Sequence, residues 1–295
     1  MRHVITCLVV ALVPLWANAQ PLKPNTPSIL HWTPEQQREG YRSIETLYKT
    51  ATIARDEAVR ALGNADRTLE VSYTRDGRNW TIDDFMKAFN VSGLMVLKDG
   101  KVLVERYGLG RQPQDRWISF SIAKSVTSTL VGAAIQDGKI KSLADYASEK
   151  IWKPVGMERD AVWMLDAAGH ELGGCCISMT LGDYARFGQF ILDGGKAGGP
   201  GSANAIMPDG WVAEATGQRI TGGALPQGVG YGYFWWVGSS GGFSALGIFG
   251  QSVTLFPADR LVIVVNSAWP RATDRDLFAG RSAFLYAVRE AAKGL

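Results

Sequence analysis

The sequence predicts an α+β fold in which an antiparallel sheet is flanked by helices. Two pairs of apolar strands lie far apart in the chain, at 91–107 and at 244–269. The segment between them carries mainly helical patterns, and an amphipathic helix closes the chain at 274–294. Because strands and helices do not alternate regularly, a parallel β-α-β arrangement is disfavoured and antiparallel pairing is expected.

The first strand pair is the clearest local feature. Val91–Leu97 and Val102–Tyr107 are apolar runs that flank Asp99-Gly100. An Asp-Gly pair favours the tight turns that join two antiparallel strands, since both residues tolerate positive φ angles. The sequence therefore predicts a β-hairpin here.

The late strands are predicted from 244–257 and 260–269, joined around Pro257-Ala258-Asp259. A further strand is expected at 231–238, which reads YGYFWWVG. Successive side chains of a strand point to opposite faces. One of the neighbours Trp235 and Trp236 could therefore line a cleft while the other packs in the core.

Helix boundaries are marked by capping residues. Thr33 before a proline starts a segment, 33–62, with a partly helical period. Thr180 and Asp183 form a capping pair, and Gly194-Gly195 stops the helix that they begin.

The N-terminus resembles an export signal. An apolar run, Val4–Trp16, precedes an Ala-x-Ala site ending at Ala19, which predicts a signal peptide at 1–19 and a periplasmic or secreted protein. The remaining residues, 20–295, are expected to form a single domain. No later run is long and apolar enough for a stable membrane anchor. The net charge of +3 comes without a basic cluster, so nucleic acid is not an expected partner.

Several site classes are disfavoured by residue counts. His170, Cys175 and Cys176 lie close together, but no fourth ligand accompanies them, so we expect no metal and no cofactor. The two neighbouring cysteines could be bonded to each other or be reduced thiols. Gly238–Gly242 matches G-x-S-x-G, yet no histidine follows Ser240, which argues against a Ser-His-Asp hydrolase.

The candidate reactive group is a serine at the start of an apolar helix. In the segment 117–136, Ser121 and Lys124 stand three residues apart, a spacing that places both side chains on one helix face. A serine hydroxyl becomes a good nucleophile when a neighbouring base takes its proton. The backbone N–H of Ser121 could face a developing oxyanion. A capping serine beside a lysine that reaches solvent is the competing interpretation of the same letters.

Several segments resemble one enzyme superfamily. SFSIAKSVTS at 119–128 resembles the S-x-x-K motif of serine β-lactamases and penicillin-binding proteins. Further segments resemble the class C-like branch, which includes 6-aminohexanoate-dimer hydrolases and esterases: GLMVLKDGKVLVERYG, IWKPVGM, DYARFGQFILDGG and YGYFWW. The resemblance covers Val71 to Ala292. It implies an exported serine hydrolase that cleaves amide or ester bonds in a small molecule, with an acyl-Ser121 intermediate and Lys124 as the base.

The family's second motif, Y-x-N or S-x-N, has no convincing match. Ser202-Ala203-Asn204 fits the letters but lies in a glycine-rich segment. AAIQDGKIKSL resembles the family's sequence just after the nucleophile helix, and ADYASEKIWKPVGM resembles its sequence well after the missing motif. In this chain the two segments are joined near Ser142–Asp145. This predicts an internal deletion, a truncated helical lobe and exposed apolar surface that favours self-association. It also supports a second hypothesis: a catalytically impaired pseudoenzyme or a ligand-binding remnant of the fold.

The family's third motif, K-T-G, is also absent. By resemblance its place is taken by Gly247–Gln251, so Ile248, Gly250 and Gln251 are predicted to form the cleft wall. The backbone N–H near Ile248 would be the second oxyanion donor. From the letters alone, an ordinary buried strand with a glycine for close packing fits equally well.

Overall fold

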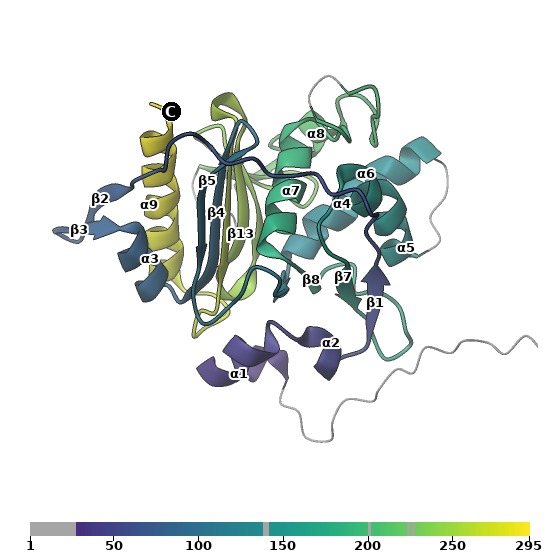
Figure 1. The fold of residues 1–295 in the computed structure, drawn as a ribbon, viewed down its shortest axis with the longest axis horizontal. Coiled ribbons are helices and arrows are strands. Elements are labelled where there is room, and N and C mark those ends of the chain that lie inside the picture. Colours follow the sequence, from purple (N-terminus) through teal and green to yellow (C-terminus); the bar gives the residue numbers. More distant parts are fainter. Residues whose placement is uncertain (1–27, 138–141, 200–201, 223–224, 226–227) are drawn as a thin grey trace, which may run out of the picture.

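The computed structural model describes residues 28–137, 142–199, 202–222, 225 and 228–295 (Figure 1). The predicted signal peptide at 1–19 lies outside this range. Within the described residues no helix is long and apolar enough to cross a membrane.

The largest sheet has eight strands in the order β5-β4-β14-β13-β12-β11-β10-β9, and every neighbouring pair is antiparallel. Its strands are β4 (Val91–Lys98), β5 (Lys101–Tyr107), β9 (Ile220–Thr221), β10 (Val229–Tyr231), β11 (Trp236–Gly238), β12 (Phe243–Gly247), β13 (Gln251–Phe256) and β14 (Leu261–Ser267).

Two smaller sheets accompany it. One has the order β1-β7-β8-β6 and the other pairs β2 with β3. Their strands are β1 (Thr50–Ile53), β2 (Ser72–Arg75), β3 (Arg78–Thr81), β6 (Trp117–Ile118), β7 (Ala161–Met164) and β8 (Ile177–Met179).

Helices cover both faces of the large sheet. The α-helices are α1 (Pro34–Gly40), α2 (Ile44–Leu47), α3 (Ile82–Ala88), α4 (Ile122–Asp137), α5 (Leu143–Ala147), α6 (Lys153–Val155), α7 (Leu181–Leu192), α8 (Trp211–Ala215) and α9 (Arg275–Ala292). Short 3-10 or π-helical turns are η1 (Ile29–His31), η2 (Ser148–Trp152), η3 (Ile248–Gly250) and η4 (Pro257–Asp259). Helices α3 and α9 lie on one side of the sheet, and α4 and α7 lie on the other (Figure 1).

Strand β13 shows how the sheet separates two cores. Val253 and Leu255 belong to the cluster that packs against α4 and α7. Phe256 belongs to the cluster that packs against α3 and α9. The alternation of side chains along a strand produces this division. The predicted class, an antiparallel sheet flanked by helices in an α+β fold, is confirmed.

Local signals predicted several boundaries correctly. Asp99 and Gly100 have φ angles of 51° and 76°, as the turn between β4 and β5 requires. Thr180 caps α7 by accepting a hydrogen bond from the backbone N–H of Asp183. Gly194 and Gly195, both with φ of 76°, end that helix.

Two predicted strands are hairpins instead. The segment 244–257 divides at Ile248–Gly250, where Phe249 has a φ of 57° and reverses the chain between β12 and β13. The segment 231–238 likewise divides into β10 and β11. A Cβ at Gly232 would lie 2.1 Å from the carbonyl oxygen of Ala215, so only glycine allows this close approach, and Phe234 takes the positive φ of the turn, 62°.

Candidate active site

Ser121 stands at a sharp turn between β6 and α4. Ser119, two residues earlier, donates its backbone N–H to the carbonyl oxygen of Ile177, and its hydroxyl accepts from the N–H of Ile177 at 3.0 Å. These bonds fix the turn to β8. Phe120 then has a φ of 45°, an unfavourable backbone conformation for a bulky residue. The turn brings the Ser121 hydroxyl to the first turn of α4.

Lys124 lies beside Ser121 as the spacing predicts. Its Nζ donates a hydrogen bond to Ser121 Oγ, with 2.7 Å between the two atoms. Both residues are half-buried. A Cβ at Gly174 would stand 3.5 Å from Lys124 Cε, so the chain at 173–176 packs along the lysine stem. The amine is therefore held against the hydroxyl and does not extend freely into solvent.

The end of β12 lies close to the Ser121 turn. A Cβ at Gly247 would lie only 2.4 Å from the carbonyl oxygen of Ser119, so only glycine allows this approach. Gly247 and Ile248 line the same cavity as Ser121. The turn at Gly247 thus forms one wall of the candidate site.

Gly250 and Gln251 lie behind that wall. A Cβ at Gly250 would lie 2.5 Å from the ring of Trp269. The buried Gln251 amide donates to the carbonyl oxygens of Phe249, at 3.0 Å, and Ser267, at 2.7 Å. Neither Gly250 nor Gln251 is among the residues that line the cavity. Their role here is to hold the turn that carries Ile248.

Two residues that line the cavity, Ser121 and Ile248, have backbone N–H groups of interest for catalysis. Within the described part of the chain, the N–H groups of Ser121 and Ile248 donate no hydrogen bond to a backbone or side-chain acceptor. Unpaired backbone N–H groups are uncommon unless water or a ligand serves them. A pair of such donors at the site of a nucleophile is the arrangement that stabilises an oxyanion.

An aromatic cluster fixes the two strained turns. The rings of Phe120 and Phe249 lie 5.2 Å apart between centroids, and Tyr41 lies 5.3 Å from the first and 6.2 Å from the second. All three side chains are buried. Left-handed conformations at bulky residues cost roughly 1–3 kcal/mol each and persist where the surroundings enforce them. The packing of these rings holds Phe120, which precedes Ser121, and Phe249, in the turn between β12 and β13, in these conformations.

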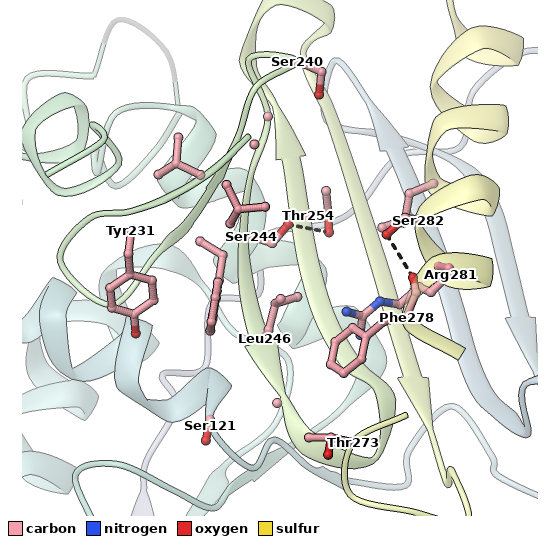
Figure 2. A pocket seen from close by; sticks show the side chains of 18 of the residues that line it. Ser121, Tyr231, Ser240, Ser244, Leu246, Thr254, Thr273, Phe278, Arg281 and Ser282 are labelled. Atoms are coloured by element: carbon pink, nitrogen blue, oxygen red, sulfur yellow. Dashed lines mark hydrogen bonds between the residues drawn. The ribbon is translucent and has the colours of Figure 1, made fainter. Parts of the chain in front are cut away.

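The cavity is an elongated space of about 830 Å³. It runs from Ser121 and Lys124 along β11 and β12 to Ser240 and to the side of α9 that carries Phe278 and Ser282 (Figure 2). Trp236 lines it, whereas Trp235 is buried and stacks near Phe187. The two tryptophans therefore divide between cleft and core, as alternation along a strand requires.

Other residues singled out from the sequence lie elsewhere. Ser202 and Asn204 belong to the segment after α7 and are not among the residues that line the cavity. Cys175 and Cys176 are joined by a disulfide bond. Among the described residues no group of three His, Cys, Asp or Glu side chains could hold a metal ion. On α4, Val131 is exposed while Val126 and Leu130 are buried.

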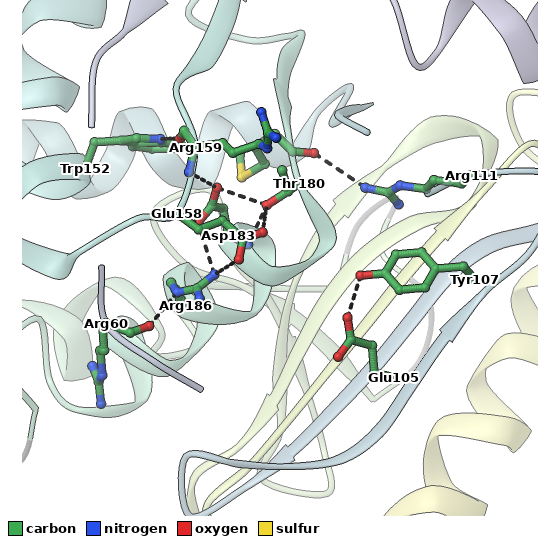
Figure 3. A network of polar contacts seen from close by, with 11 residues as sticks. Arg60, Glu105, Tyr107, Arg111, Trp152, Glu158, Arg159, Thr180, Asp183 and Arg186 are labelled. Carbon is green, nitrogen blue, oxygen red and sulfur yellow. Dashed lines mark hydrogen bonds and ion pairs between the residues drawn. The ribbon is translucent and has the colours of Figure 1, made fainter. Parts of the chain in front are cut away.

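A buried ionic network surrounds the start of α7, a helix that packs against the large sheet (Figure 3). Asp183 accepts hydrogen bonds from the backbone N–H groups of Glu158, at 2.7 Å, and Arg159, at 3.2 Å. Arg186 Nη1 pairs with Glu158 at 2.8 Å and with Asp183 at 3.3 Å. Burial, and then the neighbouring charge of Glu158, raise the pKa of Asp183 to about 6.

Comparison with known proteins gives the family. The β-lactamase family model matches residues 139–287, just over half of the chain. The 6-aminohexanoate-dimer hydrolase of Paenarthrobacter ureafaciens is 30% identical over 161 residues, which are 52% of this chain but only 39% of that protein. The aligned part thus spans about two fifths of this relative's length.

Solved structures agree with this assignment at the level of the fold. A Bacillus anthracis protein named provisionally as a 6-aminohexanoate-dimer hydrolase has a TM-score of 0.74 at 17% identity, covering 86% of this chain and 93% of its own. A β-lactamase from Mycobacterium bovis has a TM-score of 0.51 at 15% identity, covering 68% and 94%. The chain belongs to the β-lactamase family and has the fold shared by serine β-lactamases and penicillin-binding proteins.

Proposed function

We propose that the protein is an exported serine hydrolase that cleaves amide or ester bonds through an acyl-Ser121 intermediate. One observation carries the proposal: the Lys124 amine lies 2.7 Å from the Ser121 hydroxyl on the wall of a cavity. A nucleophile within hydrogen-bonding distance of a base is the arrangement that acyl transfer needs. The resemblance to 6-aminohexanoate-dimer hydrolases and esterases supports amides and esters as the substrate class.

The reaction follows from the positions of these groups. Ser121 Oγ attacks the carbonyl carbon while its proton passes to the Lys124 amine, which acts as the base. The oxyanion that forms faces the free N–H groups of Ser121 and Ile248. The adduct then collapses, and the leaving amine or alcohol takes the proton from Lys124 as its bond to carbon breaks. Water then attacks the acyl carbon while Lys124 takes one of its protons. Lys124 returns that proton to Ser121 Oγ as the bond between Oγ and the acyl carbon breaks, which releases the carboxylic acid.

A second candidate is an impaired relative that acylates slowly or only binds ligands. It is favoured by one observation: no tyrosine after Lys124 is followed two places later by asparagine. Without the hydroxyl group of the family's Y-x-N or S-x-N motif, protonation of the leaving group would rest on Lys124 alone. The internal deletion near Ser142–Asp145 and the truncated helical lobe belong to this same hypothesis.

Labelling with a fluorophosphonate probe, read by mass spectrometry, tests the first candidate. We expect the label on Ser121, and we expect hydrolysis of p-nitrophenyl butanoate that Ser121→Ala abolishes. Lys124→Ala should slow hydrolysis by about 10²- to 10⁴-fold, the usual contribution of a general base. Ser240→Ala is the matched control, because Ser240 lines the far end of the cavity with Tyr286 as its partner and no amine bonded to it.

The outcomes separate the two candidates. Label on Ser121 without steady turnover would favour the impaired relative, and no label on Ser121 would refute the acyl-serine proposal. Export is a distinct part of the proposal. It predicts that the protein recovered from outside the cytoplasm begins at Gln20, which N-terminal sequencing would read directly.

A further inference from the structure

Among the described residues, three phenylalanines have a positive φ angle: Phe120, Phe234 and Phe249. The rings of Phe120 and Phe249 are buried and pack against each other, and this packing holds their turns. Phe234, with a φ of 62°, differs because 46% of its surface is exposed. Its ring belongs to none of the apolar clusters in the described part of the chain. Because the left-handed conformation disfavours bulky side chains, packing of the fold does not explain a ring at this position.

The backbone of Phe234 is fixed beside the candidate nucleophile. Its carbonyl oxygen accepts a hydrogen bond from the Ser125 hydroxyl at 2.7 Å. Ser125 lies one helical turn after Ser121, so this bond fastens the hairpin between β10 and β11 to the start of α4. The preceding residue, Tyr233, donates its backbone N–H to the carbonyl oxygen of Ala215 at 2.8 Å. Backbone hydrogen bonds therefore hold the Phe234 turn, and the ring itself is left open.

Phe234 completes an aromatic wall, which consists of Tyr231, Phe234 and Trp236. All three residues line the cavity that holds Ser121 and Lys124. The rings of Tyr231 and Trp236 meet edge to face on the neighbouring strands β10 and β11, with 5.0 Å between their centroids. Figure 2 shows Tyr231 at the same end of the cavity as Ser121, away from α9. The aromatic wall therefore stands at the end of the cavity where the candidate nucleophile lies.

An exposed ring on a fixed backbone suits a flat aromatic ligand. Two aromatic rings attract each other in offset-stacked or edge-to-face arrangements, and this attraction adds to the burial of apolar surface. Because the Phe234 backbone is already held, little conformational entropy is lost when a ligand covers the ring. An aliphatic side chain would offer burial alone. A phenylalanine in this strained turn therefore points to a ligand that carries a ring of its own.

We propose that Phe234 is a specificity-determining residue that binds a planar aromatic group of the substrate beside the bond that is cleaved. The inference rests on the proposed function, because it places this group next to the carbonyl carbon that Ser121 attacks. The aromatic group can belong to the acyl part or to the leaving alcohol or amine. Both would present the same kind of ring to the aromatic wall, and the two sources are separated by experiment.

Pairs of esters that differ in one ring test the preference during hydrolysis. For the acyl part, p-nitrophenyl phenylacetate is compared with p-nitrophenyl cyclohexylacetate. For the leaving group, benzyl butanoate is compared with cyclohexylmethyl butanoate. The cyclohexyl group is apolar but has no π face, so a preference for the phenyl group reports ring contact. We expect kcat/KM to favour the aromatic ester of at least one pair by about 2- to 12-fold, the equivalent of one aromatic contact.

Three variants connect this ratio to the Phe234 ring. Phe234→Asn removes the ring and introduces a residue that tolerates a positive φ, so the chain should fold and the ratio should fall to about one. Phe234→Tyr keeps the ring and should keep the ratio. Tyr233→Leu is the matched control, because it removes the neighbouring exposed ring, which does not line the cavity. It should change the ratio by less than about threefold.

A binding measurement in the Ser121→Ala chain keeps the test independent of turnover. The probes are phenylacetamide against cyclohexylacetamide, and N-benzylacetamide against N-(cyclohexylmethyl)acetamide, titrated by ligand-observed NMR. The aromatic member of at least one pair should bind more tightly, and Phe234→Asn should remove the difference. Equal binding within both pairs, or a preference that survives Phe234→Asn, would overturn the inference. If hydrolysis and labelling fail but Phe234-dependent binding is seen, the proposed function is refuted and the aromatic site stands.

Discussion

Two buried arginines, Arg186 and Arg281, stand on opposite sides of the large sheet and have opposite surroundings. Arg186 lies on α7, where Glu158 and Asp183 neutralise it and the carbonyl oxygen of Arg60 accepts from its Nε at 2.8 Å. Arg281 lies on α9 with one long hydrogen bond to a carbonyl oxygen and an unpartnered Nε.

The difference separates a buried charge with acidic partners from one whose described neighbours are a carbonyl oxygen and two aromatic rings. A buried cation with its full set of partners holds neighbouring segments together, and Arg186 connects α7 to residues 60 and 158. A buried cation without an acid destabilises the empty protein, because desolvation is not offset by an ion pair. Arg281 lines the cavity that holds Ser121, and the rings of Trp269 and Phe278 beside its guanidinium offset only part of that cost.

The largest effect on stability is expected from Arg186→Met. This change leaves Asp183 and Glu158 close together without their cation, and Asp183 is fully buried. Removing one partner from a buried ion pair typically costs about 3–5 kcal/mol. We expect the free energy of unfolding, measured with guanidinium chloride, to fall by that amount. A decrease below about 1 kcal/mol would show that the network does not stabilise the fold.

The sequence predicted the parts of the fold that depend on local chemistry. The turn at Asp99-Gly100, the cap at Thr180 and the closing helix are specified by neighbouring residues, and each is present. The reversals at Phe249 and Gly232 were not predicted, because long-range contacts produce them. Phe249 takes a positive φ within the cluster of Tyr41 and Phe120, and these partners are distant in sequence.

The sequence predicted the Ser121–Lys124 contact but not the presence of Arg281 in the cavity. The spacing of Ser121 and Lys124 specified their contact, but no motif marks Arg281. A signal for it was nevertheless present in the sequence of α9. Arg281 falls on the same helical stripe as the buried residues Leu285, Val288 and Ala292, where an apolar side chain is expected. A lone charge on such a stripe indicates either a buried partner or a ligand.

The pH dependence of stability sharpens the comparison, because Arg186 pairs with the carboxyl group of Asp183, whereas among the described residues Arg281 pairs with no carboxyl group. Asp183 has its pKa raised to about 6 in the folded protein, by burial first and by Glu158 second, against about 4 in an unfolded chain. Folding therefore takes up a proton between these values. The free energy of unfolding should fall as the pH rises from about 4 to about 6, and should then level off.

We expect the free energy of unfolding to be about 1–1.5 kcal/mol higher at pH 5 than at pH 7.5, measured with guanidinium chloride. Carboxyl groups with lowered pKa values oppose this trend only at lower pH. Asp274 is one of them, because it accepts the backbone N–H of Leu277 and pairs with Arg271. Asp183→Asn should flatten the slope and Arg281→Met should leave it unchanged. Equal stability at both pH values would contradict the raised pKa.

The smallest effect on stability is expected from Arg281→Met. Methionine keeps an unbranched apolar stem beside Trp269 and Phe278 while removing an unneutralised charge. Replacing buried charges by apolar groups is often neutral or stabilising. We expect the free energy of unfolding to change by less than about 1 kcal/mol or to rise. A loss as large as that of Arg186→Met would show that Arg281, like Arg186, stabilises the fold.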